Sequence, residues 1–488
     1  MSSNLKETAL RGFSWTFLEK FGVYISDFTV GILLARLLAP KEFGLIAMIM
    51  VFIALLTPFI DSGLGRALIR KIDATDTDYS TVFWWNLMLS ICVYLILFFG
   101  APYLSLFYEE PRLTDILRVF GICVIIEALS SIQNTRLVKL MNFKSLAARS
   151  LISNFLSGIL AIYLAYSGWS YWALIVRQIV SLSLSSIFLW SISGWKPKFE
   201  FSKSAFREMF GFGSRLLASG ILDAFFNNIY PLIIGKMFSA SSLGFYNRAN
   251  SFCVIPQMLF TQTTARVSYP LLASLQNQKE QMAQTYKKLI KLISYVYFPI
   301  LMGIMGLAHV IVIVLLTEKW LPAVPLLQGL AFVSMLYPMH SINLNVLTVN
   351  GRSDLFLKLE IWKKIIIVIS ILIGQFWGVM GLIYSQIVSS CIAFIINTYF
   401  SERYIQYGLI KQCKDLFPNF VLALAMGLFL LFGSDYLNIF TWWSLIGWTI
   451  CGIAFYIGIS FLFKMDSFAY LLTLAIEKLK LKRLSIHD

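Results

Sequence analysis

Several ionisable side chains interrupt stretches of the chain that are otherwise apolar, and they carry most of the chemistry that the sequence offers. Glu19, Lys20 and Asp27 lie in the first such stretch, and Arg215 and Asp223 lie in a later one. Lys20 and Asp27 are about two helical turns apart, as are Arg215 and Asp223, so each pair shares one helix face. If these stretches cross a bilayer, each central charge costs about 2.5–3.5 kcal/mol, so we expect these residues to face a partner or a wet cavity.

Further cations lie in other apolar stretches, namely Arg177, Arg248 and Arg266. An arginine guanidinium bonds phosphate oxygens through a planar fork, and cations can replace the water that an anion loses on leaving the headgroup layer. The set therefore predicts a cavity that accepts an anion. The alternative is that these residues form structural ion pairs, for example Lys20–Asp27 or Arg215–Asp223.

The carboxylates and the terminal cations suggest two other roles. Asp27, Glu19 and Asp223 are candidates for coupling to H+ or Na+, because a carboxylate in a cavity can change its protonation or sodium occupancy between states. Arg36 and Lys236 close their apolar stretches, so we expect them to be gate residues or end anchors that snorkel to the interface. The three histidines are few and scattered, and we predict no metal site.

Composition identifies the apolar stretches as membrane-spanning helices. The chain has 488 residues, of which 58% are hydrophobic and 13% are charged, whereas soluble domains average roughly 25% charged residues. This excludes a soluble enzyme, and the net charge of +15 is spread in short clusters between apolar runs, which argues against nucleic acid as a partner. An all-α integral membrane fold with about fourteen spans is predicted, at roughly 13–38, 43–65, 81–106, 113–134, 147–166, 171–193, 209–235, 244–274, 289–316, 323–349, 355–376, 379–401, 416–433 and 441–463.

Lysine and arginine in the connections set the orientation. One side of the predicted bundle has only five of them, Lys41, Arg112, Arg118, Lys236 and Lys319. That side is the outer one, so both termini are predicted to be cytoplasmic. The outer connections are short, and the sequence has no Walker-type phosphate loop or helical zinc motif. These features favour a transporter over an enzyme such as a polymerase.

An internal repeat predicts how the helices are grouped. Residues 35–45 align with residues 235–245 at a constant offset of 200, and Asp27 aligns with Asn227. The match predicts two six-helix lobes related by a parallel repeat around a central cavity, plus a C-terminal helix pair. Convergence of short turns on small residues is the alternative. The predicted domains are the first lobe at 1–193, a cytoplasmic connector at 194–208, the second lobe at 209–402, an additional pair at 403–463 and a basic amphipathic cytoplasmic tail at 464–488.

Four short segments carry a resemblance to a known family. They are Gly12-Phe-Ser-Trp15, Leu33–Pro40, Phe43-Gly44 and Asp61–Leu64. The chain resembles the polysaccharide-exporter branch of the multidrug/oligosaccharidyl-lipid/polysaccharide superfamily, and is most similar to its colanic-acid and O-antigen flippases. The resemblance implies a two-lobed helical bundle whose cavity faces cytoplasm and periplasm in turn. The extra helix pair favours this branch over multidrug exporters, which usually have twelve helices.

The implied cargo is a polyprenyl-diphosphate-linked oligosaccharide, turned over in a bacterial inner membrane by alternating access without ATP or a cofactor. The cations expected to bind its diphosphate are Lys20, Arg177, Arg215, Arg248 and Arg266. Membrane lipids are expected partners, and a polysaccharide polymerase or glycosyltransferases are candidate protein partners. The alternative is a cation-coupled multidrug exporter, against which a cationic cavity argues because cationic drugs need an acidic or aromatic pocket.

Overall fold

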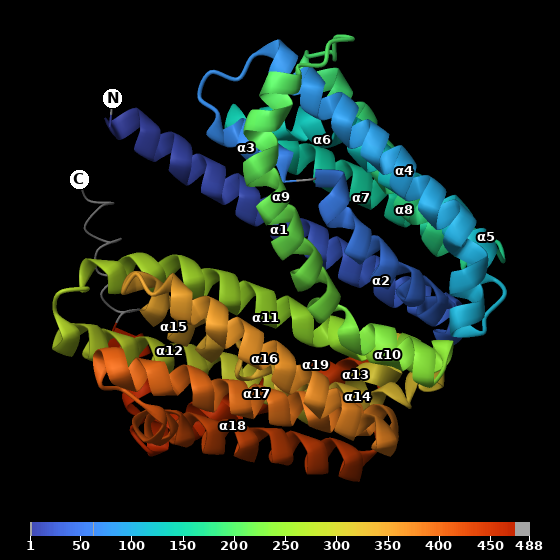
Figure 1. Cartoon of the computed structure of the whole chain (residues 1–488). Coiled ribbons are helices and arrows are strands. Elements are labelled where there is room, and N and C mark those ends of the chain that lie inside the picture. Colours follow the sequence, from blue (N-terminus) through green and yellow to red (C-terminus); the bar gives the residue numbers. More distant parts are fainter. Residues whose placement is uncertain (1, 62, 474–488) are drawn as a thin grey trace, which may run out of the picture. The chain divides into compact units, whose positions relative to one another are not determined.

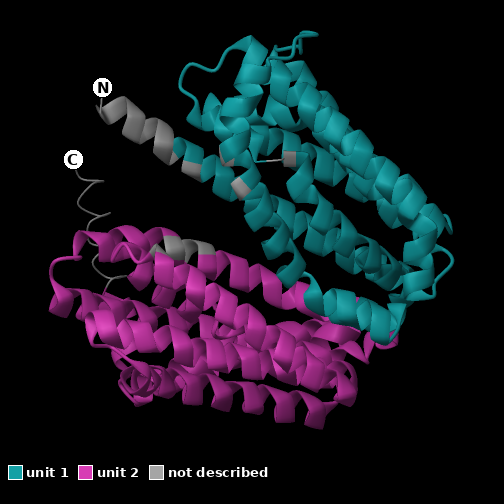
Figure 2. Ribbon diagram, in the orientation of Figure 1, with its two compact units in different colours: residues 1–247 teal, residues 248–488 magenta. Residues whose placement is uncertain are grey.

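The computed structural model describes residues 2–61 and 63–473, and all regular elements in those ranges are helical. The chain divides into two compact units, residues 1–247 and 248–488 (Figure 2). The predicted connector at 194–208 falls inside the first unit, because the helix that follows it packs on helices near the start of the chain. The predicted tail at 464–488 lies outside the described residues from position 474 onward. The division of the chain into lobes stays a prediction.

The first unit consists of ten helices and the start of an eleventh (Figure 1). They are α1 (Ser2–Leu37), α2 (Pro40–Asp61), α3 (Leu64–Arg70), α4 (Asp76–Tyr108), α5 (Leu113–Phe120), α6 (Ile122–Lys139), α7 (Phe143–Tyr166), α8 (Trp172–Ser193), α9 (Lys203–Asn227), α10 (Ile229–Met237) and the beginning of α11 (Ala240–Ser274).

The second unit contains the rest of α11 and the remaining helices (Figure 1). They are α12 (Lys279–Gly306), α13 (Ala308–Ile311), η1 (Val312–Leu316), η2 (Glu318–Trp320), α14 (Ala323–Ser334), α15 (Tyr337–Val349), α16 (Ser353–Gly374), η3 (Gln375–Trp377), α17 (Gly378–Ile405), α18 (Leu409–Leu437) and α19 (Trp442–Leu462).

Within the described ranges, nine helical stretches are long and apolar enough to cross a bilayer, and α9 adds a tenth if its two halves, bent by 51°, count as one. One of the nine, Asp354–Ile405, comprises α16 and α17, which pack against each other. α1 and α11, which carry several of the predicted charged residues, are not among the nine. The chain is therefore an all-helical, multi-pass membrane protein, and the total of fourteen spans stays a prediction.

Two of the predicted spans are broken just before a proline. The span at 209–235 is interrupted at Asn228, and Pro231 follows in the first turn of α10. The span at 323–349 divides into α14 and α15, and Pro338 lies in the first turn of α15. Proline lacks a backbone N–H, so it fits the first turn of each new helix. Other prolines lie inside α2, α4, α11, α12 and α18 without a break, so proline alone does not decide where a helix ends.

α1 and α7 run in parallel, with close contacts at small residues. A side chain added at Gly12 would meet Phe143 near the start of both helices, one at Gly22 would meet Leu151, and one at Gly158 would meet Val30. Residue numbers therefore increase together along the two helices. Small residues let membrane helices approach closely, so polar groups on their facing sides come within hydrogen-bonding distance.

The two segments that align at an offset of 200 pack against each other in the first unit. A Cβ added at Gly44 would lie 1.6 Å from the carbonyl oxygen of Ala240, and one added at Gly244 would lie 2.1 Å from that of Pro40. Pro40 and Ala240 are themselves 200 residues apart, so each copy contributes the same two positions to the contact. The contact is reciprocal, as expected where a repeat is related by a pseudo-twofold axis.

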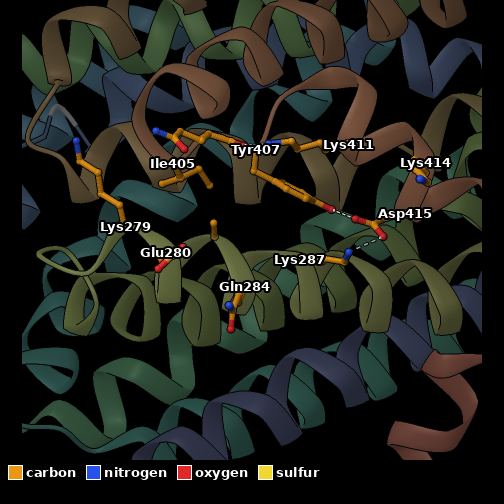
Figure 3. A pocket seen from close by; sticks show the side chains of 11 residues that line it. Lys279, Glu280, Gln284, Lys287, Ile405, Tyr407, Lys411, Lys414 and Asp415 are labelled. Atoms are coloured by element: carbon orange, nitrogen blue, oxygen red, sulfur yellow. Dashed lines mark hydrogen bonds and ion pairs between the residues drawn. The ribbon is translucent and has the colours of Figure 1, made fainter.

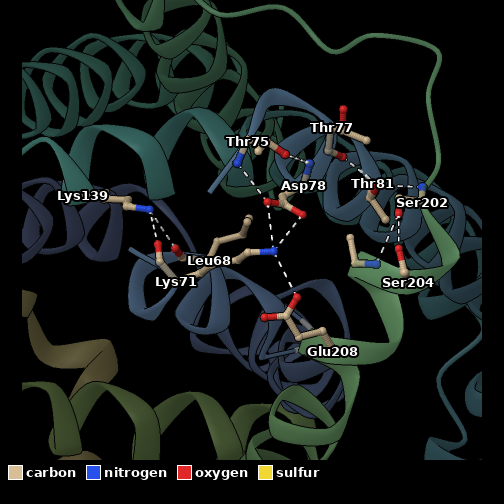
Figure 4. A network of polar contacts seen from close by, with 11 residues as sticks. Leu68, Lys71, Thr75, Thr77, Asp78, Thr81, Lys139, Ser202, Ser204 and Glu208 are labelled. Carbon is tan, nitrogen blue, oxygen red and sulfur yellow. Dashed lines mark hydrogen bonds and ion pairs between the residues drawn. The ribbon is translucent and has the colours of Figure 1, made fainter. Parts of the chain in front are cut away.

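At one end of the first unit, a polar network holds the segment before α9 (Figure 4). The ammonium of Lys71 lies 3.2 Å from Asp78 and 3.0 Å from Glu208 on α9, and Lys139 donates to the carbonyl of Leu68 at 3.2 Å. The hydrogen bond to Glu208, helped by Asp78, raises the pKa of Lys71 above its usual value despite partial burial. Lys71 therefore stays charged at physiological pH.

The same segment is also tied to the first turns of α4. Ser80 and Thr81 accept hydrogen bonds from the backbone N–H groups of Lys198 and Ser202, both at 3.0 Å, and the Trp84 indole donates to the Lys198 carbonyl at 2.7 Å. These contacts explain why the predicted connector belongs to the first compact unit.

Candidate functional site

Polar side chains of α1 meet those of α7 and α8 within the first unit. In the parallel packing described above, α1 lies along α7, and α7 in turn packs on α8. Glu19 and Asp27, two turns apart on α1, both face α7. The local sequence therefore places two carboxylates on the packed face of a helix that is otherwise largely apolar.

Asp27 is the centre of the first cluster. Its carboxylate forms an ion pair with the guanidinium of Arg177 on α8 and accepts a hydrogen bond of 2.7 Å from the side-chain amide of Asn154 on α7. The Asp27 side chain is 45% exposed and that of Arg177 is 17% exposed. The pair is therefore open on the carboxylate side, and it joins a candidate coupling residue to a candidate phosphate-binding residue.

Glu19 is the centre of the second cluster. The Ser150 hydroxyl on α7 donates to Glu19 at 2.5 Å, and the neighbouring Arg149 donates to Ser150 and to Asn134 on α6, both at 3.1 Å. Arg149 lies in the predicted span at 147–166 but was not among the candidate site residues. The signal that could have found it is the parallel register of α1 and α7, which becomes evident only in the folded chain.

Lys20 differs from its neighbours on α1. It is exposed and makes no hydrogen bond or ion pair with any described residue. The alternative of a Lys20–Asp27 pair does not occur in the structure, since Asp27 pairs with Arg177 instead. Arg36 is exposed in the last turn of α1.

The other predicted residues are spread over α9 and α11. Asp223 is exposed on α9, and the side chain of Arg215 lies outside the described residues. Arg248 is buried and Arg266 is exposed on α11 of the second unit. These two arginines are eighteen positions apart, about 27 Å along an ideal helix, so they cannot hold one phosphate group together.

Lys236 makes contacts expected of an end anchor. Its ammonium lies 3.1 Å from Glu109, just after α4, and 5.1 Å from the ring centre of Phe107. The residue after Glu109, Glu110, pairs with Lys41 at 2.8 Å. These contacts bring the start of α2, the α4–α5 turn and α10 together at one end of the unit.

The arrangement is suited to binding and release of charge. Arg177 is compensated by one carboxylate, and Lys20 adds a cation on the adjacent helix that has no counter-charge among the described residues. Near a low-dielectric environment, removing the charge of Asp27 would leave Arg177 in need of another anion. The described residues contain no group of three or more His, Cys, Asp and Glu that could hold a metal ion.

Comparison with known proteins identifies the class. Residues 33–325 match the model of the polysaccharide biosynthesis protein family. The chain belongs to this family of membrane transport proteins, within the multidrug/oligosaccharidyl-lipid/polysaccharide superfamily, which confirms the resemblance noted in the sequence. The family is one of transporters and not of enzymes.

Three relatives refine the class. The chain is 27% identical to the teichuronic acid biosynthesis protein TuaB of Bacillus subtilis (strain 168), over 76% of this chain and 77% of the relative. It is 27% identical to the succinoglycan biosynthesis transport protein ExoT of Rhizobium meliloti (strain 1021), over 67% of this chain and 66% of the relative. It is 22% identical to the lipopolysaccharide biosynthesis protein WzxC of Escherichia coli (strain K12), over 88% and 89%.

Solved structures share the fold. The lipid II flippase MurJ, in an inward closed conformation, matches with a TM-score of 0.73 at 17% identity, covering 94% of this chain and 99% of the MurJ chain. An inward-facing multidrug transporter of the MATE family matches with a TM-score of 0.61 at 15% identity, covering 79% of this chain and 96% of the other. The fold is therefore that of MurJ and the MATE transporters.

Proposed function

We propose that the chain is a flippase that moves a polyprenyl-diphosphate-linked oligosaccharide from the cytoplasmic to the periplasmic leaflet, for synthesis of a surface polysaccharide. The observation that carries the proposal is the open Asp27–Arg177 pair, with Lys20 two turns away on the same helix, in a member of a family of polysaccharide transport proteins. The lipid-linked cargo carries a diphosphate, which is the group that arginine and lysine are suited to bind.

Ion binding at Asp27 gives this site a working cycle without ATP. A proton or sodium ion on the Asp27 carboxylate weakens its pair with Arg177, and the guanidinium then becomes available to phosphate oxygens. Loss of the ion restores the pair and expels the phosphate. Lys20, Arg215, Arg248 and Arg266 belong to the same proposal as further diphosphate ligands at successive stages, with Glu19 and Asp223 as other coupling residues.

The proposal includes the finer architecture and location. Two six-helix lobes, related by the offset of 200, enclose a cavity that opens to each side of a bacterial inner membrane in turn, and Arg36 and Lys236 lie at its outer end. The reciprocal contact of Gly44 and Gly244 supports the repeat on which this arrangement rests. The proposed protein partners are glycosyltransferases, which act before the translocation step, or a polymerase, which acts after it.

The test is the leaflet location of the lipid-linked intermediates in a strain that lacks the gene. A membrane-impermeant glycan label distinguishes the leaflets. We expect complete repeat units to accumulate on the cytoplasmic leaflet and the wild-type gene to restore their passage. Complete units that still reach the outer leaflet and stay unpolymerised would contradict the proposal, because the protein would then act after translocation.

The second candidate is a cation-coupled multidrug exporter, favoured by the likeness to the MATE fold and by a carboxylate on α1. It predicts an unchanged pool of lipid-linked intermediates and a higher sensitivity to cationic drugs in the same strain. The two functions therefore give opposite results in one experiment.

A further inference from the structure

A basic pocket of about 700 Å³ lies in the second unit, apart from the charged clusters of α1, α7 and α8 (Figure 3). It is lined by the first three turns of α12, the first two turns of α18 and the turn that joins α17 to α18. Its charged side chains are four lysines and two carboxylates, Lys279, Lys287, Lys411, Lys414, Glu280 and Asp415.

The wall of this pocket is held by a set of hydrogen bonds. The Tyr407 hydroxyl donates to Asp415 at 2.6 Å, and Lys287 pairs with the other Asp415 oxygen at 3.2 Å (Figure 3). The buried Gln412 donates to the Tyr407 carbonyl at 3.0 Å, and Lys411 donates to the Gln406 carbonyl at 2.8 Å. The α17–α18 turn is therefore fixed before any ligand arrives.

Three lysines in and near the pocket have ammonium groups without a partner among the described residues. Lys279, Lys288 and Lys414 are exposed and make no hydrogen bond or ion pair with that part of the chain. α12 and α18 each have about four free backbone N–H groups in the first turn, and neither start has a side-chain cap. Lys279 and Lys414 line this pocket beside the positive ends of the two long helices, which favours an anion there. Lys288 lines only the hollow next to it.

A second hollow continues the pocket toward the apolar part of the unit. It has a volume of about 360 Å³, shares Gln284 and Lys287 with the first, and adds Lys288 and Lys291 from the next turns of α12. Lys291 is paired with Asp415 and Asp466, so Lys288 is the cation there that remains available among the described residues.

An apolar groove of about 430 Å³ follows on the same face of α12. It begins at Tyr295 and Val296 and continues past Pro299 and Gly303, between α12, α18 and α19. The positions 288, 291, 295, 299 and 303 recur every three or four residues, so they form one stripe. α12 is about 42 Å long, which exceeds a hydrocarbon core of about 30 Å, so its lysine-rich start reaches the headgroup layer.

We propose that this stripe is a binding site for an anionic phospholipid of the cytoplasmic leaflet, with its phosphate headgroup beside Lys288 and an acyl chain in the groove. Lys279 and Lys414, in the adjoining pocket, add to the positive potential that attracts the headgroup. A soluble phosphate would use the lysines but would leave the groove empty. An acidic peptide would not enter a groove lined by apolar side chains at the depth of the hydrocarbon core. The site lies wholly within the second unit and does not depend on the cargo of the transporter.

The experiment uses the full chain, purified and supplied with phosphatidylglycerol or phosphatidylcholine, with bound lipid measured by native mass spectrometry. The test variant is K279Q/K288Q/K414Q. The matched control is K144Q/K196Q/K203Q, which removes three exposed lysines of the first unit that have no partner among the described residues. Each lysine near an anionic surface is worth about a factor of five in binding, so we expect the test variant to bind phosphatidylglycerol about 100-fold more weakly.

The control variant should bind phosphatidylglycerol as the wild type does, and phosphatidylcholine should bind weakly to all three proteins. Gly303→Leu, which fills the groove, should lower phosphatidylglycerol binding while all lysines remain. Equal binding of phosphatidylglycerol to the test and control variants would overturn the proposal. Displacement of the phospholipid by inorganic phosphate alone, or by a polyprenyl diphosphate at equal concentration, would also overturn it, by assigning the lysines to a soluble anion or to the cargo.

Discussion

The contact between Gly44 and Gly244 predicts that alanine at these two positions stops transport without unfolding the protein. In the structure, an added Cβ at Gly44 would lie 1.6 Å from the Ala240 oxygen, and one at Gly244 would lie 2.1 Å from the Pro40 oxygen. Ordinary contacts of this kind begin at 3.4 Å. The helix starts must therefore separate by about 1.8 Å at Gly44 and about 1.3 Å at Gly244.

The free-energy balance decides which effect dominates. Replacing glycine with alanine in a helix favours the helix by up to about 1 kcal/mol, whereas overpacking a tight contact costs about 1–3 kcal/mol. The clash here is with backbone atoms, which cannot rotate away, so we use the upper part of that range. A net loss of about 2 kcal/mol in the closed contact lowers its population roughly 30-fold. Each helix remains intact, because alanine suits both.

The assay is export of surface polysaccharide by a strain that carries G44A/G244A, with the amount of protein in the membrane measured in parallel. We expect export to fall at least tenfold at a normal protein level. Gly100→Ala on α4 is the matched control, because no atom lies within 4 Å of its added Cβ. Normal export by the double variant would refute the idea that the cycle passes through this contact.

Three further predictions concern the site and the fold. Asp27→Asn and Arg177→Gln should each lower export at least tenfold. The exchanged variant D27R/R177D keeps an ion pair, so it should reach the wild-type amount of protein in the membrane but should not export. Full export by the exchanged variant would mean that the pair is only structural. Lys20→Gln should lower export about fivefold or more at a normal membrane level, whereas Lys144→Gln should have no effect, and equal export by both would remove Lys20 from the site. Thr75→Ala deletes the capping box at the start of α4 and should lower the free energy of unfolding by about 1 kcal/mol in denaturant titration of the purified protein; an unchanged value would mean that the Lys71 network alone holds this end.

The all-helical class and the helical location of the polar residues followed from the sequence, because both depend on local information. The number of spans did not: among the described residues nine or ten stretches could cross a bilayer, where fourteen were predicted. Apolar runs of span length set the helices, and a charge within such a run must have a partner or a cavity. The offset of 200 between Gly44 and Gly244 was also detectable, since both segments have a glycine where their backbones meet. Membership of the polysaccharide biosynthesis family agrees with the resemblance carried by the first two helices.

The partners of the charged residues could not be predicted. Asp27 and Arg177 are 150 positions apart, and nothing local indicates that α8 rather than α1 supplies the cation. Asn154 and Arg149 join the site only because α1 and α7 run in parallel with a register set by small residues such as Gly158. Register between packed helices depends on tertiary contacts, and a single sequence does not contain them.

The central claim is translocation itself, and the most direct measurement is made with the purified chain in vesicles that contain a fluorescent polyprenyl-diphosphate oligosaccharide in both leaflets. A membrane-impermeant reagent destroys fluorescence on the outer surface. We predict that the protected half of the signal is also lost when the wild-type protein is present, and stays protected with Arg177→Gln. Protection equal to that of vesicles without protein would contradict the account.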